Sequence, residues 1–124
     1  MRLDEIADII SVRRDDEKTE DDFFTRAERE YCGKRSRCLG ARYVIKKCVL
    51  DYLANQTGYG IKSYREIEVV NNALGQPMLR VFGGVREYMN HLKIKDVFIS
   101  ISHSRNWVAG MVVLSYKRVN EASF

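Results

Sequence analysis

The segment from residue 39 to residue 53 limits the possible folds of this chain more than any other, because it carries the longest helical periodicity. Its apolar residues recur at intervals of three and four, which is the spacing of one face of an α-helix. They are Ala41, Ile45, Cys48, Val49 and Tyr52. The opposite face carries Arg42, Lys46, Lys47 and Asp51. An amphipathic helix buries its apolar face against another element, so we expect this helix to pack against a sheet.

The rest of the chain is predicted to form short strands and two further helices. Strands are expected over residues 3–12, 66–70, 78–81, 97–102 and 107–116. Thr25 and Glu28 have the spacing of a capping box, which predicts a helix from there to about Gly33, and another helix is expected over residues 85–92. Residues 71–77 are the turn of a predicted hairpin, and residues 55–60 a loop. This order predicts an α+β fold with a mostly antiparallel sheet packed with helices, and one domain over residues 1–124.

The composition favours anionic partners without identifying one. The 124 residues are 45% hydrophobic, enough for a modest core, and the formal net charge is +4. Basic residues alternate with acidic ones, as in residues 13–18, rather than forming one basic arm, so no nucleic-acid partner is expected. No apolar stretch approaches the length that crosses a bilayer, so no membrane association is expected either.

The cysteine pattern indicates a reduced, cytoplasmic setting. Cys32, Cys38 and Cys48 are odd in number and lack C-x-x-C spacing. We therefore expect neither a disulfide framework nor a zinc site.

Three features are candidates for phosphate chemistry. Arg42 and Lys46 lie one helical turn apart, so they could hold a phosphate together, or they could form only the solvated face of the helix. The run from Ser100 to Ser104 offers hydroxyl groups and the His103 imidazole, either to phosphate oxygens or to the backbone at a strand end. Asp8 lies in an apolar predicted strand, where a carboxylate must be paired, bound to a metal or on the wet face.

Together these segments resemble the holo-acyl-carrier-protein synthase family of 4′-phosphopantetheinyl transferases, from about residue 6 to residue 114. The family's F-T-x-x-E-x-x-Y-C is matched in full by Phe24, Thr25, Glu28, Tyr31 and Cys32. Its opening G-x-D-I-V-x-I-x-R is similar to residues 7–14, and its G-R-F-A-A-K-E-A-x-x-K-A-L helix to residues 41–53. Its I-x-V, G-K-P and S-I-S-H-S elements are similar to residues 67–69, 75–77 and 100–104.

The resemblance implies transfer of the 4′-phosphopantetheine arm of coenzyme A to a serine of an acyl carrier protein, with release of 3′,5′-ADP, in fatty acid or polyketide biosynthesis. It also implies Mg²⁺ held by Asp8 and a helix glutamate, and a homotrimer with sites between subunits. The catalytic residues would be Asp8, Lys46 and Lys47. The coenzyme A contacts would be Arg42, Lys46, Gly75, Pro77, Ser102 and His103. Arg13 and Arg14 would contact the carrier protein.

The chain departs from the family pattern at one pair of helix positions. Lys47 stands where the family has its glutamate ligand, and Asp51 where it has a lysine. Asp51 lies about 6 Å further along the axis, whereas Mg²⁺ holds its oxygens at roughly 2 Å. Three arrangements remain open. In the first, Lys47 and Asp51 form an exposed pair in an impaired homologue that binds coenzyme A or a carrier protein without turnover. In the second, the Lys47 ammonium replaces the metal. In the third, Asp8, the pyrophosphate and water hold Mg²⁺ with Glu28 nearby.

Overall fold

The computed structural model describes residues 2–10, 23–57, 64–103 and 108–117, and for residues 2–10, Ser36, Thr57 and His103 it describes the backbone alone. The described helices are α1 (Arg26–Cys32), α2 (Ser36–Thr57) and α3 (Gly83–His91), with a short 3₁₀ turn, η2 (Tyr64–Glu66). The described strands are β1 (Arg2–Ile10), β2 (Ile67–Asn71), β3 (Pro77–Val81), β4 (Ile94–His103) and β5 (Val108–Tyr116).

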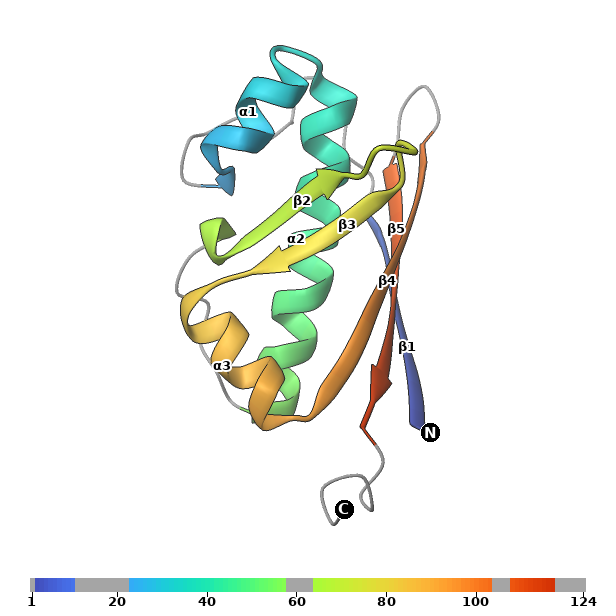
Figure 1. Cartoon of the computed structure of the whole chain (residues 1–124). Helices are drawn as coiled ribbons and strands as arrows, with labels where there is room; N and C mark the ends of the chain where they lie inside the picture. Colours follow the sequence, from blue (N-terminus) through green and yellow to red (C-terminus); the bar gives the residue numbers. More distant parts are fainter. Residues whose placement is uncertain (1, 11–22, 58–63, 104–107, 118–124) are drawn as a thin grey trace.

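The strands form two antiparallel sheets, one of three strands in the order β1-β5-β4 and one made of the β2–β3 hairpin. Figure 1 shows α2 running along the three-stranded sheet, with the hairpin crossing it and α1 and α3 at its two ends. Because the helix has sheet residues on more than one side, little of its surface is left for solvent. The main core cluster accordingly joins side chains of α2 to side chains of β2, β5 and α3.

The contact between α2 and β5 is close enough to require a glycine. A Cβ placed on Gly110 would lie 2.8 Å from Ile45 Cδ1 and 3.0 Å from Val44 Cγ1. Distances below 3.0 Å are shorter than packed carbon atoms tolerate, so a side chain at this position would force the Ile45 side chain or α2 itself to shift. Gly110 pairs with Asp8 in the register of β1 and β5, which places this backbone position of β1 beside the same stretch of α2.

The α+β class, the antiparallel pairing and the order of elements agree with the prediction. α1 has the expected capping box, in which Thr25 and Glu28 each accept from the other's backbone N–H. Two details are wrong. The strands form two sheets rather than one, and residues 55–57, expected in a loop, continue α2. Residues 11, 12, 58–60 and 107 of the predicted elements lie outside the described residues. None of the helices in the described part of the chain has the length and apolar character of a membrane span.

Candidate functional site

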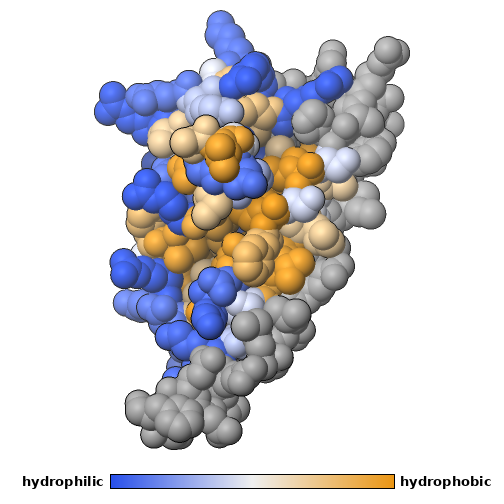
Figure 2. Space-filling view, turned by 45° about the vertical axis from the view of Figure 1, so that its right-hand side comes forward, coloured by the Kyte–Doolittle hydropathy of each residue, from blue (hydrophilic) through white to orange (hydrophobic). Residues whose placement is uncertain are grey.

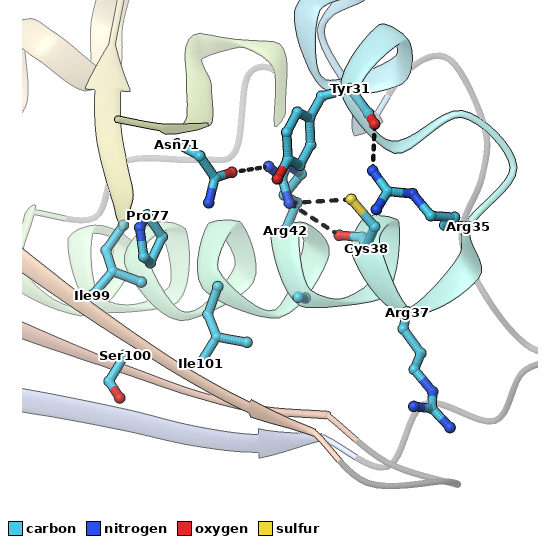
Figure 3. Close-up of a pocket in the computed structure, with 11 residues that line it drawn as sticks. Tyr31, Arg35, Arg37, Cys38, Arg42, Asn71, Pro77, Ile99, Ser100 and Ile101 are labelled. Carbon is cyan, nitrogen blue, oxygen red and sulfur yellow. Dashed lines mark hydrogen bonds between the residues drawn. The ribbon is translucent and has the colours of Figure 1, made fainter. Parts of the chain in front are cut away.

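A cavity of about 760 Å³ lies where the first turns of α2 face the β2–β3 hairpin and β4 (Figure 3). We call it the arginine cavity, because three arginines and no acidic residue occur among the described residues that line it. Its lining residues are Tyr31, Arg35, Arg37, Cys38, Ala41, Arg42, Asn71, Pro77, Ile99, Ser100 and Ile101. Its volume is that of a small-molecule site, and its charge suits an anion.

Arg42 is held in a fixed position on the wall of the arginine cavity. Its Nη2 donates to Asn71 Oδ1 at 2.7 Å, and its Nη1 lies 3.4 Å from both the carbonyl oxygen and the Sγ of Cys38. The Tyr31 ring covers the guanidinium carbon at 4.8 Å (Figure 3). Burial lowers the pKa of Arg42, partly offset by Glu28, but an arginine keeps its charge at any physiological pH. The cavity therefore has an immobilised cation, which is the form that binds phosphate most strongly.

The hairpin positions Arg42 through Asn71. The Asn71 amide donates from Nδ2 to the Gly75 carbonyl oxygen at 2.9 Å, so the same side chain links the turn to α2. Gly75 has φ +81°, a left-handed conformation that glycine adopts without strain. Pro77 opens β3 and lines the cavity. Two hairpin residues were expected to contact coenzyme A. Pro77 lines the cavity, whereas Gly75 shapes the turn and is not among the described lining residues.

β4 contributes the opposite wall of the cavity. Ser100 and Ser102 are exposed and Ile101 is half-buried, which confirms the predicted alternation for these residues. Ser100 lines the cavity, and Ser102 lies further along the strand, paired with Ala109. His103 ends β4 opposite Val108, and its side chain lies outside what the structure describes.

Lys46, expected at a phosphate, is buried and is not among the described residues that line the arginine cavity. Its side chain is 0% exposed, and its Nζ donates to Glu28 Oε1 at 2.5 Å and to the Phe23 carbonyl oxygen at 2.7 Å. Glu28 Oε2 accepts from the Val69 N–H at 2.8 Å, so the pair joins α1, α2 and β2. Burial lowers the pKa of Lys46 and Glu28 opposes that shift. Lys46 therefore has a structural role here.

Lys47 is the next residue on α2, but it pairs with Asp51 and not with Glu28 or Phe23. Its Nζ donates to Asp51 Oδ2 at 2.7 Å, and both side chains are partly exposed. This is the exposed helix pair that the sequence left open as its first alternative. The nearby Tyr64 ring packs against Tyr43 at 5.8 Å, and burial raises the pKa of the Tyr64 hydroxyl.

The expectation of no disulfide is wrong, because Cys32 and Cys38 are bonded to each other. Cys32 is the last residue of α1 and Cys38 lies in the first turn of α2, and the sharp turn between the helices brings their Cα atoms to 5.4 Å. That separation lies in the normal range for a disulfide. Spacing rules missed the bond because it depends on how the two helices meet. Cys48 is buried and takes no part in it.

Known proteins resemble this chain in sequence and in fold. No family model matches the sequence. The holo-acyl-carrier-protein synthase of Dehalococcoides mccartyi (strain CBDB1) is 39% identical over 90 residues, which are 73% of this chain and 73% of that protein. The chain belongs to the holo-acyl-carrier-protein synthase family. The resemblance inferred from the sequence motifs is thereby confirmed.

Solved structures of holo-acyl-carrier-protein synthases have the same fold. The acyl carrier protein synthase of Mycobacterium tuberculosis superposes with a TM-score of 0.73 at 25% identity, over 91% of this chain and 96% of that one. The Helicobacter pylori holo-acyl-carrier-protein synthase, solved in complex with coenzyme A, superposes with a TM-score of 0.69 at 22% identity, over 90% of this chain and 99% of that one. This chain therefore has the fold of these solved structures.

The described side chains of this chain do not fit a magnesium site made of two carboxylates. Among the described side chains, which do not include Asp8, no group of three or more His, Cys, Asp or Glu lies close enough together to hold a metal. Lys47 places an ammonium where the family pattern has a carboxylate, and Asp51 is engaged with it. Glu28, suggested above as a helper, is 1% exposed and its two oxygens accept from Lys46, Thr25 and Val69. It therefore cannot serve a metal at the surface.

Sequence reasoning missed several residues of the arginine cavity. Arg35 and Arg37 belong to a charged stretch with no helical or strand periodicity of its own, and Asn71 was placed only in a turn. Tyr31 and Cys32 were noted as motif residues without a role. The one usable signal was the complete F-T-x-x-E-x-x-Y-C match, because that segment supplies Glu28 to Lys46 and Tyr31 to Arg42.

Proposed function

We propose that this chain transfers the 4′-phosphopantetheine arm of coenzyme A to a serine of an acyl carrier protein. The serine oxygen forms a bond to the phosphorus next to the pantetheine, the pyrophosphate P–O bond breaks, and 3′,5′-ADP leaves. The observation that carries the proposal is the arginine cavity in a chain of this family: three arginines line one space, and no carboxylate occurs among its described lining residues. Coenzyme A carries phosphates, which such a set of arginines binds.

The arginine cavity holds the phosphates of coenzyme A in this proposal. Arg42 is the main contact because Asn71 and Tyr31 fix it, and Arg35 and Arg37, which line the same cavity, add positive charge. Pro77 of the hairpin forms one edge of the nucleotide site. Gly75, Ser102 and His103 keep their proposed role as further coenzyme A contacts.

Asp8 and Lys47 form the reacting end of the site in this proposal. Asp8 pairs with Gly110, which lies against Val44 and Ile45, so its strand position is close to the middle of α2. Lys47 follows two residues later on the same helix. An ammonium beside the transferred group stabilises the charge that develops on phosphoryl oxygens. The Asp8 carboxylate takes the proton of the carrier serine.

The proposal includes an acyl carrier protein as partner and a homotrimer as assembly, in the cytoplasm. Figure 2 shows hydrophobic side chains gathered in the middle of the face on which β4 lies. Phe98 of β4 and Met111 of β5 are exposed. They share one face of the sheet, because Phe98 lies opposite Val113, and Val113 and Met111 are two residues apart on the same strand. A neighbouring subunit covers these residues in the proposed trimer. Arg13 and Arg14, outside the described residues, contact the acidic carrier protein.

The test is a transfer assay read by intact mass. The chain is incubated with coenzyme A and an apo acyl carrier protein, with magnesium in one arm and a chelator in another. The proposal predicts a carrier protein heavier by one phosphopantetheine arm and the appearance of 3′,5′-ADP. Binding of coenzyme A without modification of any carrier protein would instead identify an impaired homologue. Absence of both would refute the proposal.

A further inference from the structure

The Cys32–Cys38 disulfide forms part of the wall of the arginine cavity. Cys38 lines the cavity and is half-buried, whereas Cys32 is 1% exposed. The two sulfurs of the bond therefore differ in access. The cavity therefore opens onto Cys38 and not onto Cys32.

The sulfur of Cys38 also lies beside a cation. Arg42 Nη1 is 3.4 Å from Cys38 Sγ, and Arg35 and Arg37 line the same cavity. In the disulfide this sulfur is neutral, so Arg42 keeps its full charge for an anion. A guanidinium next to a cysteine lowers the pKa of the thiol, so reduction places a thiolate there. That thiolate pairs with Arg42 and competes with any anion in the cavity.

We propose that Cys32 and Cys38 form a thiol–disulfide exchange site that weakens anion binding in the arginine cavity when it is reduced. The co-reactant is a small dithiol, and the reverse reaction uses the corresponding disulfide. The inference rests on the proposed function only for the identity of the anion, a phosphate of coenzyme A.

The exchange balances in two steps. A thiolate of the dithiol attacks Cys38 Sγ, a mixed disulfide forms, and the Sγ–Sγ bond breaks with Cys32 leaving as a thiolate that takes up a proton. The second thiolate of the dithiol then attacks its own sulfur in the mixed disulfide and releases Cys38. Two electrons pass from the dithiol, which becomes a cyclic disulfide, to the protein. Arg42 stabilises Cys38 as the leaving thiolate, and a low leaving-group pKa speeds this step.

Reduction has two consequences that can be separated. It neutralises part of the charge of Arg42, and it removes the crosslink between the end of α1 and the start of α2. Both Cys32→Ser and the double variant Cys32→Ser/Cys38→Ser lack the crosslink. They differ only in whether a thiolate stands next to Arg42, so their comparison isolates the charge.

The experiment uses 3′,5′-ADP as the anion, because coenzyme A has a thiol of its own that would enter the exchange. Its affinity is measured by calorimetry for the oxidised wild type and for the wild type reduced with dithiothreitol. Alkylation with iodoacetamide and peptide mass give the state of Cys38 in each sample. We expect alkylation of Cys38 only after reduction, and an affinity about tenfold weaker in the reduced protein, as for the loss of one close charge contact.

The variants decide whether charge is the cause. Cys32→Ser is expected to bind 3′,5′-ADP several-fold more weakly than the double variant, and dithiothreitol is expected to change neither. Equal affinity of the oxidised and reduced wild type would overturn the proposal, as would equal affinity of the two variants. So would an oxidised protein that does not bind 3′,5′-ADP at all.

The transfer assay separates this inference from the proposed function. Redox-dependent binding of 3′,5′-ADP in a chain that modifies no carrier protein would retain the exchange site and reject the transferase. Transfer activity together with a 3′,5′-ADP affinity that does not change when Cys38 is reduced would retain the transferase and reject the exchange site.

Discussion

Lys46 and Lys47 are neighbours in the sequence, yet the structure gives them opposite environments. Lys46 is fully buried and pairs with Glu28, whereas Lys47 is partly exposed and pairs with Asp51. A helix turns by 100° per residue, so adjacent side chains leave it in different directions. At the residue scale the role of a charged group in this chain therefore follows from its neighbour in space, and each lysine predicts a different experiment.

The buried pair predicts a large loss of stability. Lys46→Ala leaves Glu28 charged, buried and short of its ammonium partner, which costs about 3–5 kcal/mol. The matched control is Arg26→Ala, which breaks an exposed pair with Glu30 at 2.9 Å and should cost about 0.5 kcal/mol or less. Urea unfolding of the two variants and the wild type measures both values. Similar losses in the two variants would contradict the account.

The exposed pair predicts a gain of metal binding on charge exchange. Lys47→Glu combined with Asp51→Lys keeps an ion pair at the same spacing and places a carboxylate where the family pattern has its ligand. Calorimetry with MgCl₂ is expected to show binding to the exchanged variant and much weaker binding to the wild type. Asp51→Lys alone is the control, since it adds no carboxylate. Equal magnesium affinity in all three proteins would refute this reading of position 47.

At the scale of elements, the hairpin acts on α2 through one amide. Asn71→Leu removes the acceptor for Arg42 and the donor to the Gly75 carbonyl. A lost hydrogen bond to a charged group corresponds to about a tenfold or larger loss of affinity, here for 3′,5′-ADP in calorimetry. Asn72→Ala is the control, because the Asn72 side chain bonds within the turn: its Oδ1 accepts from the Leu74 and Gln76 N–H groups, and its Nδ2 donates to Gln76 Oε1.

These two variants separate positioning of Arg42 from general disturbance of the turn. The expected result is a large loss for Asn71→Leu and a small one for Asn72→Ala. If both lose the same affinity, Asn71 acts only by shaping the turn.

The packing of α2 on β5 predicts a second effect at this scale. Gly110→Ala introduces a Cβ 2.8 Å from Ile45 Cδ1, and overpacking of this kind costs about 1–3 kcal/mol. Ile45→Val removes that same carbon. Ile45→Val should therefore lower the free energy of unfolding by less in the Gly110→Ala background than in the wild type. A double-mutant cycle by urea unfolding measures this difference. Purely additive losses would mean that α2 shifts freely away from β5.

Elements that local hydrogen bonds determine could be predicted from the sequence. The parts of the site that depend on packing between elements could not. The capping box of Thr25 and Glu28 and the 71–77 turn follow from short-range hydrogen bonds, so sequence patterns found them. The sequence left open whether Arg42 and Lys46 hold a phosphate or form only the solvated face of α2. Both are buried, because α1 and the hairpin cover that face. No periodicity within the helix indicates which other elements will cover it.

At the scale of the whole molecule, the exposed outer face of β4 and β5 predicts association. Phe98 is 57% exposed and lies near Met111 on that face, although large apolar side chains rarely stay clustered on a free surface. We expect three chains per particle in analytical ultracentrifugation and a monomer for Phe98→Glu. Asn90→Glu, which adds the same charge on exposed α3, should leave the assembly unchanged. A monomeric wild type would remove the trimer from the proposal.

The central claim is that the arginine cavity receives the phosphates of coenzyme A, and a crystal structure of the chain with coenzyme A tests it most directly. The account predicts phosphate oxygens within hydrogen-bond distance of the Arg42 guanidinium, between the start of α2, the hairpin and β4. Coenzyme A bound elsewhere, with the space beside Arg42 holding only water, would contradict it.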